Sequence, residues 1–145
     1  MAVQTAYSDT MDAARPGMIA NTEPHNLISR GVEDAAGIGF GVAAAQGAND
    51  RGIKAFGAGD KFVGVVVRER SLNANNVGDI FEQYADARIM RKGTIWVVAS
   101  VAVAAGDPIT VDDATGDFGI AGNVEIAGRW ETSAAAGELA KINLA

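Results

Sequence analysis

Apolar and polar residues alternate along much of this chain in short runs with a period of two, the pattern of strands that pack one face. Residues 38–43 show this alternation, residues 27–33 and 61–70 also indicate strands, the latter by their β-branched residues, and turn signals recur about every ten residues. No convincing long helix is visible. The pattern predicts an all-β fold, a compact β-barrel or sandwich-like domain of short strands with at most short helical turns.

Several pairs of short runs flank turn-like sequences and predict hairpins. The expected pairs are 87–91 with 94–98 around Lys92-Gly93, 109–111 with 118–120 around residues 112–117, and 129–133 with 139–144. We also expect a short strand at 18–20, a loop at 46–52, a polar connection at 73–79 and one helical turn at 77–84 capped by Asp79.

The first 24 residues are polar, with scattered apolar positions and no sustained period. Pro16-Gly17 and Glu23-Pro24 interrupt this stretch. We therefore divide the chain into an extended N-terminal arm, residues 1–24, and a β domain, residues 25–145.

The stretch GIGFGVAAA, residues 37–45, raises the question of a phosphate-binding glycine loop. A dinucleotide loop needs a strand, then G-x-G-x-x-G, then a helix whose first N–H groups hold the pyrophosphate. Here the spacing is G-x-G-x-G, and Gly47 follows too soon for a crossover helix. We interpret residues 38–43 as one strand, whose glycines allow bulges or the close approach of a neighbouring backbone.

The charge and composition of the chain argue against several classes of function. The 145 residues carry a net charge of −6, which disfavours direct binding to nucleic acid, and the chain has no cysteine for disulfides or thiolate metal sites. The longest apolar run, 95–105, is broken by Ser100 and is far shorter than the roughly 20 residues of a membrane helix. We expect a soluble protein with neither nucleic acid nor a membrane as a direct partner.

Candidate chemical groups do not assemble into an active site. His25 is the one histidine, and the acidic residues of 107–117 are what hairpin turns select and lack the EF-hand order. Glu33 and Asp34 are strand neighbours that would point to opposite faces. The basic group Arg88, Arg91 and Lys92 could contact an acidic partner or form a solvated hairpin end. We predict no catalytic residue, metal or cofactor.

The aromatic residues are expected to pack rather than react. Trp96 and Trp130 lie in apolar alternation, and with Phe40 we assign them to core or trimer packing.

The order of several segments resembles that of the small cement, or head-decoration, proteins of tailed bacteriophages. The segments are VQTAYSDTMDAARPGMIAN, ISRGVEDAAGIGFGVAAAQG, RKGTIWVVASVAVAAGDPITVDDATGDF and RWETSAAAGELAKINL. They cover most of the chain, and residues 49–78 are the least distinctive part. The resemblance implies a non-enzymatic β domain on the exterior of the virion capsid, commonly a trimer, present in the host cytoplasm during assembly.

The leading hypothesis is therefore a cement protein that binds the major capsid protein and itself. We expect capsid contacts from Ala2, Val3, Gln4, Thr5, Ala6 and Tyr7, because an arm can add a strand to a neighbouring sheet through main-chain hydrogen bonds. Two alternatives are a small trimeric β-fold enzyme of nucleotide metabolism and a carbohydrate-binding or adhesion module.

Overall fold

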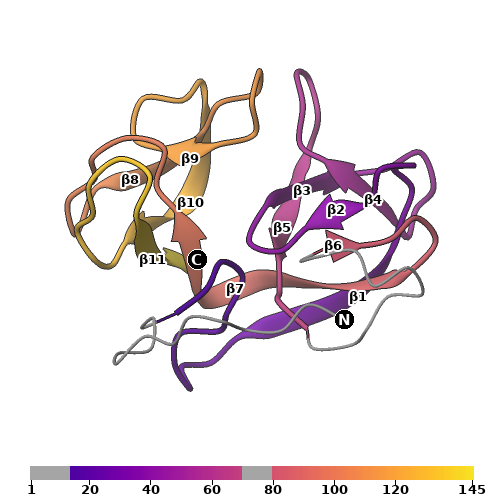
Figure 1. The fold of residues 1–145 in the computed structure, drawn as a ribbon, viewed down its shortest axis with the longest axis horizontal. Coiled ribbons are helices and arrows are strands. Elements are labelled where there is room, and N and C mark those ends of the chain that lie inside the picture. The colour runs from indigo at the N-terminus through magenta and orange to yellow at the C-terminus, as the bar shows by residue number, and fades with distance from the viewer. Residues whose placement is uncertain (1–13, 70–79) are drawn as a thin grey trace, which may run out of the picture.

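Strands and tight turns make up the chain in the computed structural model, which describes residues 14–69 and 80–145 (Figure 1). These residues contain no helix, and none of them forms a helix that could cross a membrane. The predicted all-β fold is confirmed. The strands are β1 (Asn26–Val32), β2 (Ile38–Gly39), β3 (Ala43–Gln46), β4 (Gly52–Ala55), β5 (Phe62–Val66), β6 (Ile80–Phe81), β7 (Asp86–Val98), β8 (Pro108–Val111), β9 (Phe118–Gly119), β10 (Val124–Trp130) and β11 (Leu139–Leu144).

A first ring of strands closes in the order β1-β4-β3-β5-β7, because β7 also pairs with β1. Its interior is an apolar cluster that includes Val32, Ile53, Val66 and Ile89, all nearly inaccessible to solvent. The short β2–β6 pair contributes Ile38 and Phe81 to the same cluster. Closure leaves few exposed strand edges, and alternating side chains fill the interior.

A second ring runs in the order β7-β11-β10-β8-β9. Ala99, just after β7, forms a bridge with Phe118 in β9, so this set of strands also returns on itself. The larger apolar cluster fills this ring and extends to residues of β3 and β5, so it reaches into both rings beside the smaller cluster.

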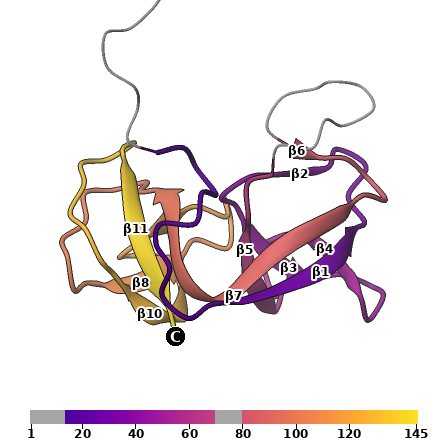
Figure 2. The same ribbon diagram turned by 90° about the horizontal axis from the view of Figure 1, so that it is seen from below.

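Strand β7 belongs to both rings, and the hairpin predicted at Lys92-Gly93 is wrong. The strand continues from Asp86 to Val98, pairing first with β1 and β5 and then with β11 (Figure 2). Gly93 has a φ of 125°, which allows the strand to change direction between the rings without reversing. Because β7 pairs with different strands before and after Gly93, these pairings outweigh the local turn signal of Lys92-Gly93.

The single strand predicted for residues 38–43 is also wrong. β2 ends at Gly39, a turn follows at Phe40 and Gly41, and β3 starts at Ala43. Gly41 has a φ of 74°, and its N–H donates to the carbonyl of Val66 at 2.8 Å. The expected close approach of a neighbouring backbone does occur here, since a Cβ on Gly41 would lie 2.7 Å from the nitrogen of Gly17.

The predicted helical turn at 77–84 is wrong within the described residues. Residues 80–81 form β6, which pairs with β2, and Gln83 and Tyr84 form a turn. Pairing with β2 provides the main-chain hydrogen bonds of these residues, which a helical turn would have formed within itself. The rest of that prediction, and the polar connection at 73–79, lie outside the described residues.

Residues 17–20 lie along the second half of β7. Gly17 N–H donates to the Trp96 carbonyl at 2.8 Å, Trp96 N–H to Met18 at 2.9 Å, and Ala20 N–H to Thr94 at 3.0 Å. The strand expected at 18–20 is present as a single bridge between Ile19 and Ile95. The arm's residues 1–13 lie outside the described residues, and its boundary at residue 24 stays a prediction.

Candidate interaction surfaces

A carboxylate at the end of β1 organises the turn between β3 and β4. Glu33 accepts hydrogen bonds from Ala48 N–H at 2.7 Å, Asn49 N–H at 2.9 Å and the Asn49 side-chain amide at 2.9 Å. A Cβ on either Gly47 or Gly52 would overlap this carboxylate, so both glycines leave room for it. The main-chain N–H groups of Asn49 and then Ala48 lower the pKa of Glu33.

The neighbouring Asp34 holds the other end of β4. Its Oδ2 accepts the N–H of Ala55 at 2.8 Å. The carboxylates of Glu33 and Asp34 therefore accept hydrogen bonds from different main-chain N–H groups of the β3–β4 hairpin. This adjacent acidic pair stabilises the hairpin.

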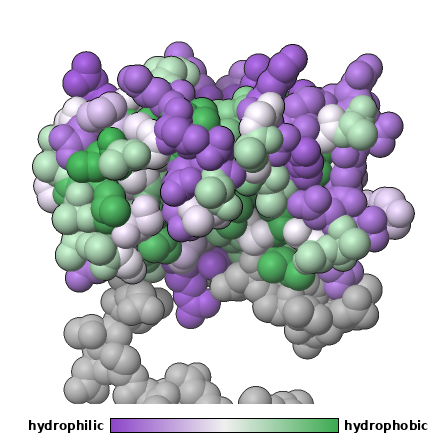
Figure 3. Space-filling view, turned by 90° about the horizontal axis from the view of Figure 1, so that it is seen from above, coloured by the Kyte–Doolittle hydropathy of each residue, from purple (hydrophilic) through white to green (hydrophobic). Residues whose placement is uncertain are grey.

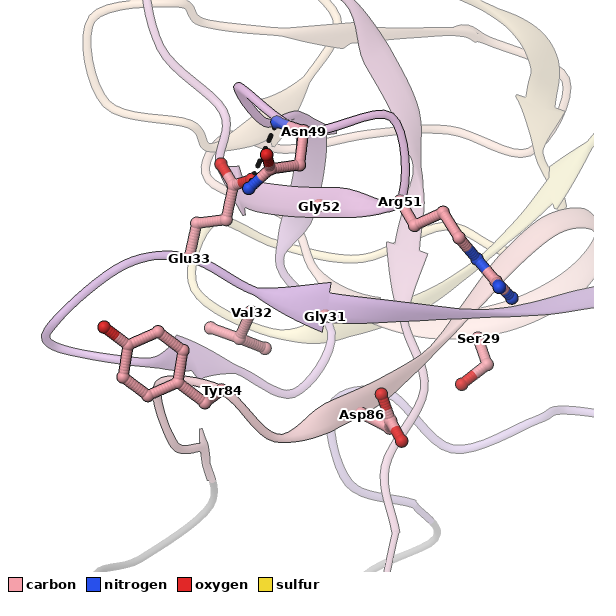
Figure 4. Close-up of a pocket in the computed structure, with 9 residues that line it drawn as sticks. All are labelled: Ser29, Gly31, Val32, Glu33, Asn49, Arg51, Gly52, Tyr84 and Asp86. Atoms are coloured by element: carbon pink, nitrogen blue, oxygen red, sulfur yellow. Dashed lines mark hydrogen bonds between the residues drawn. The ribbon is translucent and has the colours of Figure 1, made fainter.

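A groove of about 550 Å³ lies over the seam between β1 and β4 (Figure 4). The seam is short, with the parallel pairs Gly31–Gly52 and Val32–Ile53. In the close-up, Arg51 extends past Ser29, while Tyr84 lies at the opposite end beyond Glu33. The lining residues are Ser29, Gly31, Val32, Glu33, Asn49, Arg51, Gly52, Tyr84 and Asp86.

Tyr84 is the most exposed of the large hydrophobic residues that the structure describes, at 85%. Its φ of 68° is in the left-handed region, which is uncommon for a bulky side chain. Its N–H donates to the Val32 carbonyl at 2.8 Å, which ties this turn to β1. Such strained positions concentrate at functional sites, so Tyr84 is a candidate contact residue.

A second candidate surface is the apolar end of the second ring, which we define by Val98, Val101 and Ile120. These side chains are 41%, 40% and 39% exposed. Residues 93–106 and 118–123 contain no charged residue, and Val101 lies beside Gly119, next to Ile120. Apolar side chains gather over the second ring in Figure 3. Exposed apolar surface of this kind is typical of a protein contact.

The three aromatic residues selected from the sequence occupy different environments. Trp130 is 1% exposed and donates its indole N–H to the Gly119 carbonyl at 3.2 Å. Phe40 is 9% exposed and packs edge-on against Phe81. Trp96 is half-buried, with the Lys141 ammonium 5.1 Å from its ring centre. Residues Ala2, Val3, Gln4, Thr5, Ala6 and Tyr7 lie outside the described residues.

The remaining polar candidates take part in turns or stay exposed. The ring of His25 contacts the Glu23 carbonyl at 3.1 Å, Asp107 accepts the N–H of Ala104, and Asp112 accepts that of Ala114. No group of three or more metal-ligating side chains occurs within 14–69 and 80–145. Arg88, Arg91 and Lys92 are exposed on a continuous strand rather than at a hairpin end.

Sequence reasoning missed Tyr84 and the groove. A lone aromatic residue between Gln83 and Asp86 was the available signal, but nothing local indicates a left-handed backbone there. The groove depends on pairing between β1 and β4, which are distant in sequence.

Comparison with known proteins identifies a family. The family model described as structural cement protein (E217 gp24/Pam3 gp6) matches residues 3–145. Among solved structures, the chain is similar to one from the capsid of Myoviridae phage XM1, with a TM-score of 0.78 and 16% identity over 99% of this chain and 98% of that chain. It also matches the N base of the head fiber gp8.5 of bacteriophage phi29, with a TM-score of 0.49 and 12% identity over 84% and 95%. No curated protein sequence matches the chain.

Proposed function

This chain belongs to the structural cement protein family, and we propose that it binds the outer surface of a phage capsid as a homotrimer and stabilises contacts between major capsid subunits. The observation that carries the proposal is the family match over residues 3–145. The family is structural, so the chain is not an enzyme and the nucleotide-enzyme alternative is wrong.

The surface of the molecule supports attachment through several modest contacts. The apolar end offers uncharged surface, the groove offers polar main chain and charged side chains, and we assign further capsid contacts to Ala2–Tyr7. A trimer would engage several subunits at once, so weak contacts add through effective concentration. Binding to the assembled shell then stabilises that shell by mass action.

The test uses capsids assembled without this protein, to which purified protein is added. Wild type is expected to saturate the shell and to raise its temperature of disruption. Electron cryomicroscopy of the decorated shell should show three copies per site on the exterior. Density inside the shell, or single isolated copies, would contradict the proposal.

Val101→Asp and a deletion of Ala2–Tyr7 test the apolar end and the N-terminal residues separately. Val101→Asp places a charge on the apolar end, and we expect weaker attachment because that charge must be desolvated on binding. Ala127→Asp is the matched control, since Ala127 is exposed on β10, outside the apolar end. Deleting Ala2–Tyr7 should leave the fold intact and reduce occupancy. Unchanged occupancy of both Val101→Asp and the deletion would exclude these two surfaces from the capsid contact.

A further inference from the structure

Gly31 lies at the floor of the groove, and neither its backbone conformation nor its packing within the protein requires a glycine there. Gly31 is the last residue of β1 that pairs with β7, opposite Asp86, and has no positive φ. A Cβ there would meet no atom nearer than the Arg51 carbonyl oxygen at 3.9 Å. Glycine weakens a strand interior, and where internal packing does not demand it, it marks the close approach of another backbone. Gly52 differs, because the Glu33 carboxylate fills the space beside it.

Main-chain groups beside this floor are open to a partner. Gly31 N–H donates to the Arg51 carbonyl at 2.9 Å and Glu33 N–H to the Ile53 carbonyl at 2.9 Å, whereas Val32 N–H points the other way, to the Ala85 carbonyl just before β7. Because N–H directions alternate along a strand, Ser29 directs its N–H and C=O to the same side as Gly31. β4 begins at Gly52 and does not reach Ser29, which therefore meets no main-chain partner among the described residues.

Two guanidinium groups flank Ser29 without a carboxylate partner. Arg51 extends past Ser29 in Figure 4, and Arg88 is the residue opposite Ser29 in the β1–β7 pair. Within 14–69 and 80–145 neither side chain forms an ion pair or a hydrogen bond. Asp86 lines the groove near Gly31, and the Glu33 carboxylate is already satisfied by its three donors. The Ser29 end of the groove therefore favours an acidic group.

We propose that this groove binds an extended acidic segment of the capsid subunit, with its main chain over Gly31, hydrogen bonds to Ser29 and a carboxylate beside Arg51. The proposal rests on the proposed function and names where the shell contacts the protein. Tyr84 bounds the far end and supplies exposed aromatic surface, the kind of rigid anchor that dominates many interfaces. Extended segments commonly bind in this way, with main-chain hydrogen bonds giving affinity and flanking side chains giving specificity.

The shell subunit is a better source for this segment than a second copy of the chain. The described residues are folded into the two rings and the connections that pack on them, so a second copy offers no free acidic strand among them.

The test compares the binding of three variants to capsids assembled without the protein. Gly31→Leu fills the groove floor, Arg51→Gln removes the guanidinium, and Ala127→Leu adds the same leucine side chain on the exposed face of β10 as a control. Gly31→Leu and Arg51→Gln should each raise the half-saturating concentration at least about tenfold. Ala127→Leu should bind as wild type.

Thermal unfolding distinguishes lost contacts from lost structure. Gly31→Leu should unfold at the wild-type temperature or above it, because leucine is favoured over glycine in a strand and the site has room. If Gly31→Leu proves unstable, Arg51→Gln carries the test, since the Arg51 side chain forms no hydrogen bond or ion pair with any described residue.

Other results would contradict either the groove proposal alone or the proposed function as well. Wild-type binding by both groove variants overturns the groove proposal and leaves the proposed function intact. A map of the decorated shell in which another copy of this chain fills the groove, or in which the groove is empty, also overturns it. Failure of the wild-type protein to bind shells contradicts the proposed function itself and the groove proposal with it.

Discussion

Gly17 and Gly41 meet backbone to backbone, with no space for a side chain on either. A Cβ on Gly17 would lie 2.8 Å from the nitrogen of Gly41, and a Cβ on Gly41 would lie 2.7 Å from the nitrogen of Gly17. Both have a positive φ, and Gly17 also accepts the N–H of Arg68 at 2.7 Å. This contact joins the N-terminal segment to the turn between β2 and β3, so the glycine-rich stretch serves packing.

Gly41→Ala is expected to lower the free energy of unfolding by more than the cost of placing alanine in a left-handed backbone conformation. Alanine in the left-handed region costs about 1–2 kcal/mol, and the clash with Gly17 adds at least about 1 kcal/mol. Gly59→Ala is the matched control, because Gly59 has a φ of 76° with no atom within 4 Å. Denaturant unfolding measures both free energies. Equal losses for the two variants would show that the Gly17 contact contributes nothing.

Glu33 makes stability depend on pH. Its folded pKa is below the ordinary value of 4.5, so its contribution is fully present above pH 4.5 and is lost as the pH falls through the folded pKa. Glu33→Gln should therefore lower the unfolding temperature at neutral pH. The difference from wild type should shrink as the solution is acidified, because the wild-type carboxylate is then protonated too.

Glu125→Gln is the control for that titration. Glu125 is exposed on β10, and its side chain accepts no hydrogen bond from the described residues. Its unfolding temperature should follow that of wild type across the same pH range. A gap between wild type and Glu33→Gln that is constant from pH 3 to pH 7 would show that the carboxylate charge is not what stabilises the turn.

Short strand signals separated by regular turn signals were sufficient to predict the fold class and several strands. Residues 27–33 correspond to β1, and the hairpin around residues 112–117 is β8 and β9. The errors fall where pairing between distant segments decides the outcome. Lys92-Gly93 has the composition of a turn, but β1 and β11 pair on either side of it and keep β7 continuous.

The candidate surfaces were less predictable than the strands. The loop predicted at 46–52 from its composition includes Gly52, the first residue of β4, and no strand was predicted for the rest of β4. Its pairing with β3 and the carboxylates of Glu33 and Asp34 hold it in place, and these contacts come from other parts of the chain. The groove and the exposure of Tyr84 follow from that arrangement, so local sequence could not indicate them.

The two tryptophans should respond differently to the same substitution. Trp130→Phe replaces the buried indole with a smaller phenyl ring and leaves the Gly119 carbonyl without its indole donor, which should cost about 1–3 kcal/mol. Trp96→Phe should cost no more than about 1 kcal/mol, because the ring is half-buried and a phenyl ring can still face the Lys141 ammonium. Urea unfolding of both variants checks the difference. A larger loss for Trp96→Phe would contradict the assignment of Trp130 to the core.

Thr94 should determine how firmly residues 20–23 are held to the β domain. Its buried hydroxyl donates to Glu23 at 2.8 Å and accepts from the Asn143 amide at 2.9 Å. Thr94→Val leaves both partners without that hydroxyl and should cost about 1–2 kcal/mol, with faster hydrogen exchange at Ala20 N–H. Thr115→Val, in an exposed turn, should leave that exchange unchanged. If exchange at Ala20 is equally slow in both variants, the pairing with β7 alone holds this segment, and the predicted arm ends before residue 20.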